Sequence, residues 1–251
     1  MLSRMNEIVP FSTATSIFDN GCGSGSVISA ILDIYGAQIP ASTKLLAGDF
    51  SPAMLERLKE FKSAKVREGN EVWSRVEIKK IDAHDLTSIP NENVSHITGG
   101  HLYFLLDNPA RALAETYRVL SPGGILGITS GRGGQHIDAL QNAIEQIRPG
   151  TNLKMIKEEW ANADSVKAQL HNAGFDEIET FVVEAEMRYD SHETLGDMCL
   201  LMPIMKNVVE GFSEDEMVGL KACVIERLKE ANPSEPGLLK GMNIVAIVRR
   251  M

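Results

Sequence analysis

The chain has 251 residues, of which 43% are hydrophobic and 24% charged, a composition typical of globular proteins and not of disordered ones. Its 34 acidic and 25 basic side chains give a net charge of −9, which disfavours nucleic acid as a partner. Its apolar stretches are too short to span a bilayer, and its three scattered cysteines predict neither a disulfide framework nor a zinc site. We therefore expect a cytoplasmic protein that acts on a small molecule, away from membranes.

The first half of the sequence alternates between short β-prone runs and helical patterns. Ser51 before Pro52 is expected to cap a helix, and residues 121–124 are expected to form a tight turn. Strands that alternate with helices predict βαβ units, hence a mostly parallel sheet with helices on both faces. The predicted strands are 15–18, 43–47, 75–81, 94–98 and 125–129, and the predicted helices are 27–35, 53–67 and a third that begins at Asn108-Pro109.

After Ser130 the order of the predicted elements changes. Ser213 and Glu216 have the spacing of a capping box, and Asp164 is a candidate N-cap. A strand, a helical excursion and a returning strand predict an antiparallel hairpin at one edge of the sheet. The elements expected here are a helix from Asp164 to Gly174, a strand over 177–183, helices over 193–206 and 213–231, and a last strand over 243–248.

Residues 17–25 carry the most information about function. A strand ends at Asp19, and glycines at alternate positions from Gly21 to Gly25 precede a helix, so that a ligand could approach main-chain N–H groups. Asp49 and Asp82 end the next two predicted strands. Since parallel strands end at the same edge of a sheet, these acids are expected to share one nucleoside-type ligand. The glycine spacing differs from the dinucleotide fingerprint, and from these residues alone a structural turn stays an alternative.

With these motifs the sequence resembles the class I S-adenosylmethionine-dependent methyltransferases. The matching motifs are Asp19-Asn-Gly-Cys-Gly-Ser-Gly25, Gly48-Asp-Phe-Ser-Pro-Ala-Met-Leu55, Asp82-Ala83 followed by Asp85-Leu86, and Glu115-Thr-Tyr-Arg-Val-Leu-Ser-Pro-Gly-Gly124. Within the class it is most similar to fungal secondary-metabolite enzymes, including the gliotoxin-pathway thiol methyltransferases. The sequence segments on which this similarity rests are Phe18-Asp-Asn-Gly-Cys-Gly, Val94-Ser-His-Ile-Thr and Cys199-Leu-Leu-Met-Pro.

The resemblance implies an α/β, Rossmann-like class I methyltransferase fold with a mostly parallel seven-stranded sheet in the order 3-2-1-4-5-7-6. It implies one domain over 1–251, with a cofactor-binding core at 15–130 and acceptor-side helices and C-terminal edge strands at 131–251. It also implies S-adenosylmethionine as cofactor and methyl transfer to a small-molecule N, O or S acceptor. No metal site is expected, because the sequence shows no cluster of histidines and carboxylates that would require one.

The family's motifs assign the residues that would bind the cofactor. Asp19 and the glycine segment would hold the methionine part, Asp49 the ribose hydroxyls, and Asp82 with the main chain of Ala83 the adenine edge. Gly99 would lie beneath the sulfonium. The complete expected set is Asp19, Asn20, Gly21, Cys22, Gly23, Gly25, Asp49, Phe50, Met54, Asp82, Ala83 and Gly99.

His101 is the candidate catalytic residue. It follows the fourth predicted strand, where open α/β sheets bind ligands, and an imidazole can orient an acceptor or take its proton. The alternative is a histidine packed within a loop. Candidate substrate-binding residues are Tyr103, His136, Trp160 and Met202, although the apolar patch around Met202 also fits core packing.

About 16 residues precede the first predicted strand, where members of the family usually have helices that cover the cofactor. We expect those helices to be absent, which leaves either a homodimer covering the cofactor site or an open site. Two other functions stay open. One is a degenerate relative that binds or cyclises a small molecule without methylating it. The other is a tRNA-modifying methyltransferase, which would need a basic face that a net charge of −9 disfavours.

Overall fold

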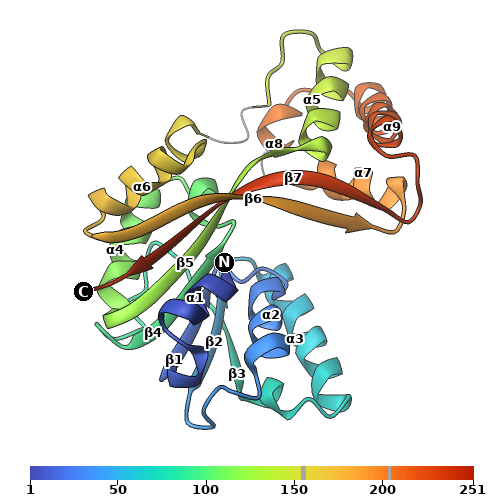
Figure 1. Ribbon diagram of the computed structural model, residues 1–251. Coiled ribbons are helices and arrows are strands. Elements are labelled where there is room, and N and C mark those ends of the chain that lie inside the picture. The colour runs from blue at the N-terminus through green and yellow to red at the C-terminus, as the bar shows by residue number, and fades with distance from the viewer. Residues whose placement is uncertain (154–156, 203–204) are drawn as a thin grey trace. The chain divides into compact units, whose positions relative to one another are not determined.

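The computed structural model describes residues 1–153, 157–202 and 205–251, and its described strands form one seven-stranded sheet (Figure 1). The sheet order is β3-β2-β1-β4-β5-β7-β6, as the resemblance implies. The strands β1 to β5 pair in parallel, and the arrows of β6 and β7 point in opposite directions. The strands are β1 (Ser16–Asn20), β2 (Lys44–Asp49), β3 (Val76–Lys80), β4 (Val94–Gly100), β5 (Leu120–Gly134), β6 (Glu177–Tyr189) and β7 (Gly237–Arg249).

Helices cover both faces of the sheet: α2 and α3 lie on one face, and α4 and α6 on the other (Figure 1). The described α-helices are α1 (Leu2–Ile8), α2 (Ser26–Tyr35), α3 (Pro52–Arg67), α4 (Pro109–Val119), α5 (Gln135–Ile147), α6 (Ala163–Asn172), α7 (His192–Leu200), α8 (Met205–Val208) and α9 (Glu214–Ala231). Short 3-10 helices occur at Phe11–Thr13, Glu71–Arg75, Tyr103–Leu105 and Glu158–Trp160. No helix of the described chain is both long and apolar enough to cross a membrane.

Side-chain caps determine where several helices begin. Ser51 accepts a hydrogen bond from the amide of Met54, as predicted, and Asn108 caps α4 in the same way. For α6 the expected cap is wrong, because Asn162 and not Asp164 accepts the hydrogen bond, from the Ser165 amide. The predicted helix over 193–206 ends at Leu200 in the structure, and residues 203–204 of that prediction lie outside the described residues.

The residues of the expected turn at 121–124 belong to β5 in the structure. Here β5 already begins at Leu120, and the Gly123 amide donates to the carbonyl of Arg250, 2.7 Å away. Gly123 has a φ of 74°, and the pairing of β4 with β5 shifts register between Val94 and His96. The residues of the turn motif therefore form an irregular start to a long strand.

A helix precedes β1, contrary to expectation. In α1 the side chain of Met5 is fully buried, and a Cβ added to Gly127 of β5 would collide with its sulfur. His96 of β4, also fully buried, places Nε2 3.1 Å from the carbonyl oxygen of Val9, directly after the helix. The glycine in β5 and the histidine in β4 thus let the N-terminal segment dock on the sheet.

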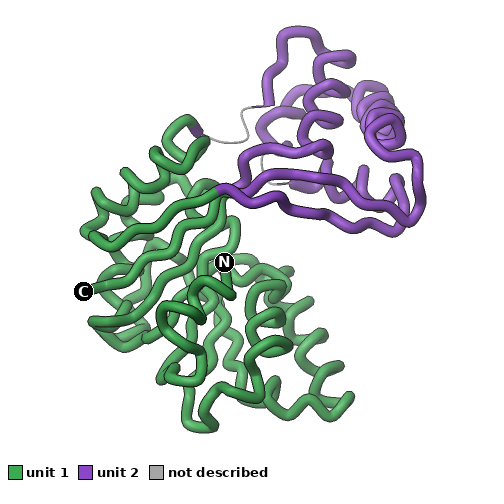
Figure 2. Tube along the Cα trace, viewed as in Figure 1, with its two compact units in different colours: residues 1–130, 158–181, 244–251 green, residues 131–157, 182–243 purple. Residues whose placement is uncertain are grey.

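The described chain forms two compact units (Figure 2). Unit 1 comprises residues 1–130, 158–181 and 244–251 and holds the strands β1 to β4 with the glycine segment. Unit 2 comprises 131–157 and 182–243, and its core is an apolar cluster that includes Leu140, Ile144, Leu195, Val224 and Leu228. The organisation of the chain as a single domain stays a prediction.

Candidate functional site

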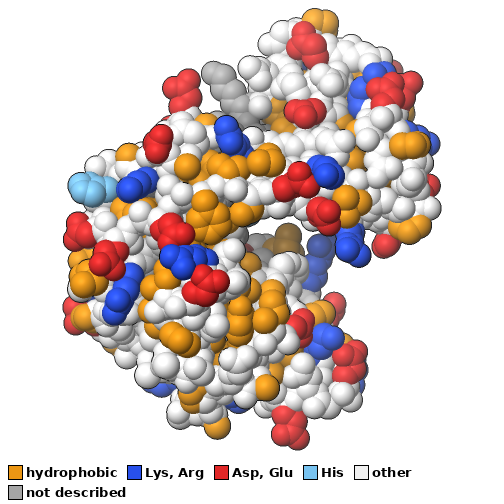
Figure 3. Space-filling view, viewed as in Figure 1, with side chains coloured by type: hydrophobic (Ala, Val, Ile, Leu, Met, Phe, Trp, Pro, Cys, Tyr) orange, Lys and Arg blue, Asp and Glu red, His pale blue; other side chains and the backbone are white. Residues whose placement is uncertain are grey.

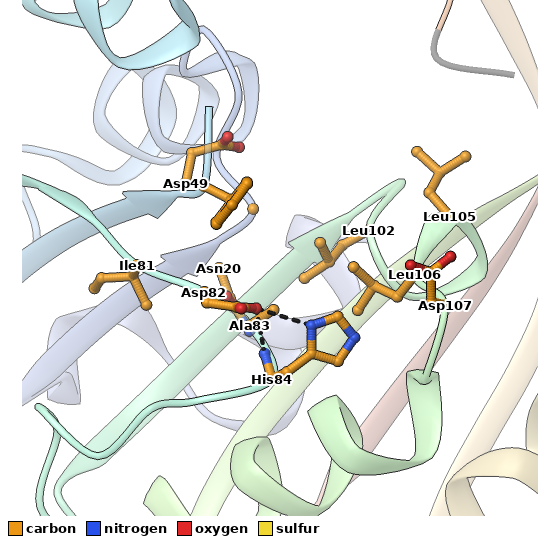
Figure 4. Close-up of a pocket in the computed structure, with 12 residues that line it drawn as sticks. Asn20, Asp49, Ile81, Asp82, Ala83, His84, Leu102, Leu105, Leu106 and Asp107 are labelled. Atoms are coloured by element: carbon orange, nitrogen blue, oxygen red, sulfur yellow. Dashed lines mark hydrogen bonds and ion pairs between the residues drawn. The ribbon is translucent and has the colours of Figure 1, made fainter. Parts of the chain in front are cut away.

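A cavity of about 370 Å³ lies in unit 1 at the carboxyl ends of neighbouring strands (Figure 4). The cavity collects side chains from the ends of β1 and β2, from the loop after β3 and from the segment after β4. Its lining residues are Asn20, Gly21, Asp49, Phe50, Ile81, Asp82, Ala83, His84, Leu102, Leu105, Leu106 and Asp107. The structure therefore brings together six of the residues expected to bind a cofactor: Asn20, Gly21, Asp49, Phe50, Asp82 and Ala83.

The glycine segment forms a tight bend beside this cavity. Gly21, Gly23 and Gly25 have φ angles of 67°, 54° and 96°, the left-handed region that other residues rarely occupy. A Cβ added to Gly21 would lie 2.6 Å from a methyl carbon of Leu102, whereas one added to Gly23 would meet nothing within 4 Å. The bend therefore depends on glycine for its conformation, and at Gly21 also for space.

Asp49 ties this bend to the start of α3. One carboxylate oxygen accepts the amide of Gly23 at 2.8 Å, and the other accepts the amide of Ser51 at 2.8 Å. The side chain is half-buried and lines the cavity. Because each carboxylate oxygen has a second lone pair, Asp49 retains the capacity to accept hydrogen bonds from a ligand.

Asp19 supports the bend from within the core and does not line the cavity. It is fully buried and accepts hydrogen bonds from the Ile28 amide at 3.1 Å and the Thr98 hydroxyl at 2.7 Å. Burial raises its pKa to about 7, and the charge of Asp49 adds to the rise, while both hydrogen bonds oppose it. The contribution of Asp19 is therefore to the geometry of the bend and of the first turn of α2.

Asp82 lies two residues beyond the end of β3 and is paired with His84. One oxygen of Asp82 accepts both the His84 amide at 2.9 Å and the ring nitrogen Nδ1 at 2.8 Å (Figure 4). The hydrogen bond from the His84 amide is the main reason that the pKa of Asp82 lies below its ordinary value. The side chain is 46% exposed, so that the ionised carboxylate lies at the mouth of the cavity.

Apolar side chains form the rest of the cavity wall. The ring of Phe50 is 65% exposed, with the ammonium group of Lys80 5.2 Å from its centre. Leu102, Leu105 and Leu106 line the cavity from the segment after β4. An exposed aromatic face next to carboxylates suits a ligand that has both a flat ring and hydrogen-bond donors.

Besides Asp19, five other residues expected to bind the cofactor lie outside the cavity lining: Cys22, Gly23, Gly25, Met54 and Gly99. Cys22 is 6% exposed, and burial raises the pKa of its thiol, so it fills space in the bend. At Gly99 an added Cβ would lie 2.5 Å from the ring of Tyr103. The absence of a side chain at Gly99 therefore makes room for this tyrosine.

Tyr103 and Trp160 are core residues in the structure. Each is 1% exposed, their rings stack with centres 6.4 Å apart, and the Tyr103 hydroxyl lies 2.8 Å from that of Thr116. Neither has accessible surface for the predicted contact with substrate. Both rings instead stabilise the segment that carries His101 and Leu102.

His101 is exposed and does not line the cavity. Its φ of 53° is left-handed, and its amide donates to the carbonyl and hydroxyl oxygens of Thr129 at 3.0 and 3.1 Å. Its ring meets that of Phe104 edge-on, with centres 5.8 Å apart. Unusual backbone geometry at a solvent-facing histidine is compatible with a functional position, and the catalytic role of His101 stays a prediction.

His136 and Met202 belong to unit 2. His136 lies half-buried in the first turn of α5, and Met202 packs against the apolar core of the unit. Their contacts with a substrate stay predictions.

The sequence interpretation missed half of the cavity lining: Ile81, His84, Leu102, Leu105, Leu106 and Asp107. His84 lies inside the motif that starts at Asp82. Its position two residues after Asp82 was a sufficient signal to include it among the site residues. The leucines carried no such signal, because an apolar residue after a strand is usually part of the core.

Comparisons with known sequences point to one family. Residues 18–128 match a family described as a methyltransferase domain. "Methyltransferase ucsB" of an Acremonium species is 33% identical over 98% of this chain and 85% of its own length. The acetylaranotin bis-thiomethyltransferase of Aspergillus terreus is 24% identical over 80% of this chain and 67% of its own.

Solved structures agree at the level of the fold. The YcgJ protein of Bacillus subtilis superimposes with a TM-score of 0.57 at 13% identity, over 100% of this chain and 99% of its own. The sheet order, the cavity at the strand ends and the similarity over nearly the whole chain lead to one conclusion. The chain belongs to the class I S-adenosylmethionine-dependent methyltransferases and is an enzyme of the type represented by its fungal relatives.

Proposed function

We propose that the cavity binds S-adenosylmethionine and that the enzyme methylates a nitrogen, oxygen or sulfur atom of a small organic acceptor in secondary metabolism. One observation carries the placement of the donor. Asp49 and Asp82, from the ends of adjacent strands, line the same cavity as the side-chain-free bend at Gly21. Acidic groups at neighbouring strand ends are where Rossmann-like sheets bind nucleoside hydroxyls.

The described residues fit each part of this donor. Asp49 has lone pairs for the ribose hydroxyls, and the carboxylate of Asp82 with the amide of Ala83 suits the adenine edge. The exposed ring of Phe50 offers a face for the base. Gly21 gives the methionine part close access to the main chain.

When bound, S-adenosylmethionine supplies a methyl group on a positively charged sulfur, which is already an activated leaving group. The residues of the chain then have to align the reactants, and alignment can supply most of the acceleration. We assign His101 the role of orienting the acceptor or taking its proton. A thiol or an amine acceptor needs less of this help than a hydroxyl.

Several observations support a small organic acceptor. The chain carries a net charge of −9, and Figure 3 shows acidic and basic side chains interspersed over the described residues of one face. That distribution does not favour a polyanion such as tRNA. The bis-thiomethyltransferase relative supports sulfur as one candidate atom. A cytoplasmic location and a homodimer that covers the cavity belong to the same proposal, and light scattering tests the dimer.

Isothermal titration with S-adenosylmethionine and S-adenosylhomocysteine tests the donor site. We expect both to bind with one site per chain, and no binding of either at millimolar concentration would overturn the proposal. The substitution His101→Asn tests the role of His101 in the reaction separately from donor binding. Asparagine tolerates the left-handed backbone at this position, so the fold should be kept. The variant should keep its affinity for S-adenosylhomocysteine and lose turnover with an acceptor.

A further inference from the structure

The main chain of His84 is held from both sides. Its amide donates to Asp82 at 2.9 Å, and its carbonyl oxygen accepts the Nε of Arg111, from α4, at 2.9 Å. The residue therefore has a fixed backbone at the wall of the cavity. A fixed backbone determines where the imidazole ring can reach.

The ring of His84 makes one described hydrogen bond. Nδ1 lies 2.8 Å from the Asp82 oxygen that the amide also reaches, and Nε2 is buried with no hydrogen-bond partner among the described residues. Figure 4 shows the ring between Asp82 and Leu106, with its second nitrogen on the edge away from Asp82. Because the carboxylate is an acceptor, Nδ1 carries the proton. Among the described side chains, the ring of His84 therefore forms a hydrogen bond only with Asp82.

This arrangement leaves the two oxygens of Asp82 unequal. One accepts two N–H donors from His84, and the other has no described hydrogen bond. The side chain of Asp82 is 46% exposed. Without the two hydrogen bonds from His84, its carboxylate could rotate toward water. These two hydrogen bonds therefore restrict the orientation of the Asp82 carboxylate in the wall of the cavity.

We propose that His84 is a positioning residue that locks the carboxylate of Asp82 and thereby makes the donor site selective for a purine with a 6-amino group. The inference rests on the proposed donor site. A fixed carboxylate accepts a hydrogen bond from the amine but repels the oxygen of a 6-oxo purine. A carboxylate that is free to rotate can turn away from the 6-oxo group and avoid the repulsion. The preference for a 6-amino over a 6-oxo purine then becomes smaller.

The experiment measures the affinities of S-adenosylhomocysteine and S-inosylhomocysteine by isothermal titration. The ratio of the two dissociation constants is compared in the wild type, His84→Leu and His84→Asn. Asparagine places a side-chain N–H donor close to the position of Nδ1, whereas leucine keeps bulk without a side-chain donor and leaves only the main-chain amide on Asp82. The amide of Ala83 contributes equally in every variant. His171→Leu, an exposed histidine of α6, is the matched control.

We expect the ratio to fall about fivefold or more in His84→Leu and to stay within about twofold of wild type in His84→Asn and in the control. An unchanged ratio in His84→Leu overturns the inference, as does an equal fall in His84→Asn. Because each ratio compares two ligands on the same folded variant, a loss of stability does not imitate the effect. A wild type that binds neither ligand overturns the donor site itself.

Discussion

Asp19 and Asp49 stabilise the same glycine bend through different main-chain amides. Asp49 accepts from Gly23 inside the bend, while Asp19 accepts from Ile28 in the first turn of the following helix. Asp49 remains accessible to a ligand, and Asp19 is fully buried. Substitution of the two carboxylates should therefore have different consequences.

Replacement of Asp49 by alanine should weaken the binding of S-adenosylhomocysteine by about 1 to 3 kcal/mol, because the ribose hydroxyls lose their acceptor. The Gly23 and Ser51 amides also lose their partner, which should lower stability. Titration calorimetry and thermal unfolding measure the two effects. Asp164→Ala, an exposed carboxylate of α6, is the control, and an affinity equal to wild type in Asp49→Ala would show that another residue binds the ribose.

The raised pKa of Asp19 makes stability depend on pH. The ordinary value is 3.8 and the folded value about 7, so the folded state holds the proton more tightly between these two pH values. The contribution of Asp19 to stability is fully present below pH 3.8 and is lost as the pH rises through about 7.

Asp19→Asn cannot ionise, so its stability relative to wild type should increase as the pH rises from 5 to about 8, by a few kcal/mol at most. Urea unfolding of both proteins at several pH values measures this difference. A difference that is constant over the whole range would contradict the ionisation of a buried carboxyl.

Two aromatic residues that the sequence interpretation assigned to substrate binding are buried in the structure. Tyr103 and Trp160 follow strand ends, where ligand-binding residues are common, yet they stack on each other in the core. An aromatic residue after a strand fits either role, and only its burial distinguishes them. The acids were easier to predict, because a charged group at a strand end needs solvent, a ligand or a hydrogen-bond network.

At the scale of elements, local chemistry predicted helix starts well. Ser213 accepts the amide of Glu216, and the Glu216 carboxylate accepts the Ser213 amide in return, which completes the expected capping box. Arg148 of the same unit also donates to Glu216, and this contact is the main cause of a pKa of about 2 for that carboxyl. The start of α9 is thus held by its own cap and by the residue that follows α5.

Ser213→Ala should lower the free energy of unfolding by about 1 kcal/mol, since the Glu216 amide loses its acceptor. Chemical denaturation followed by circular dichroism measures the change. Ser234→Ala, in an exposed loop of the same unit, should leave stability within about 0.5 kcal/mol of wild type. Equal stability of the two variants would mean that the cap contributes nothing.

Elements without local signals were missed. The helix α1 has no side-chain cap, and its one fully buried residue, Met5, is held by contact with β5. The motif at 121–124 has the composition of a turn, but pairing of Gly123 with Arg250 continues the strand. In both cases residues distant in sequence decide the local structure, and a local pattern cannot report them.

At the scale of the whole molecule, the sheet order followed from the alternation of strands and helices together with the family motifs. The division into two units could not be predicted in this way, because unit 2 is built from 131–157 and 182–243, which are separated by a segment of unit 1. A unit assembled from separate segments has no linker at its boundary, and composition along the chain does not reveal it.

The glycine bend, the acids at the strand ends and hence the family could be predicted from residue types at short spacing. Which of those residues face a ligand depends on how the chain packs. The tertiary structure buried Asp19, Tyr103 and Trp160, left Asp49 and Asp82 accessible, and set His84 against Asp82. The reason is physical: backbone conformation follows from neighbouring residues, whereas exposure to a cavity depends on how distant segments pack around it.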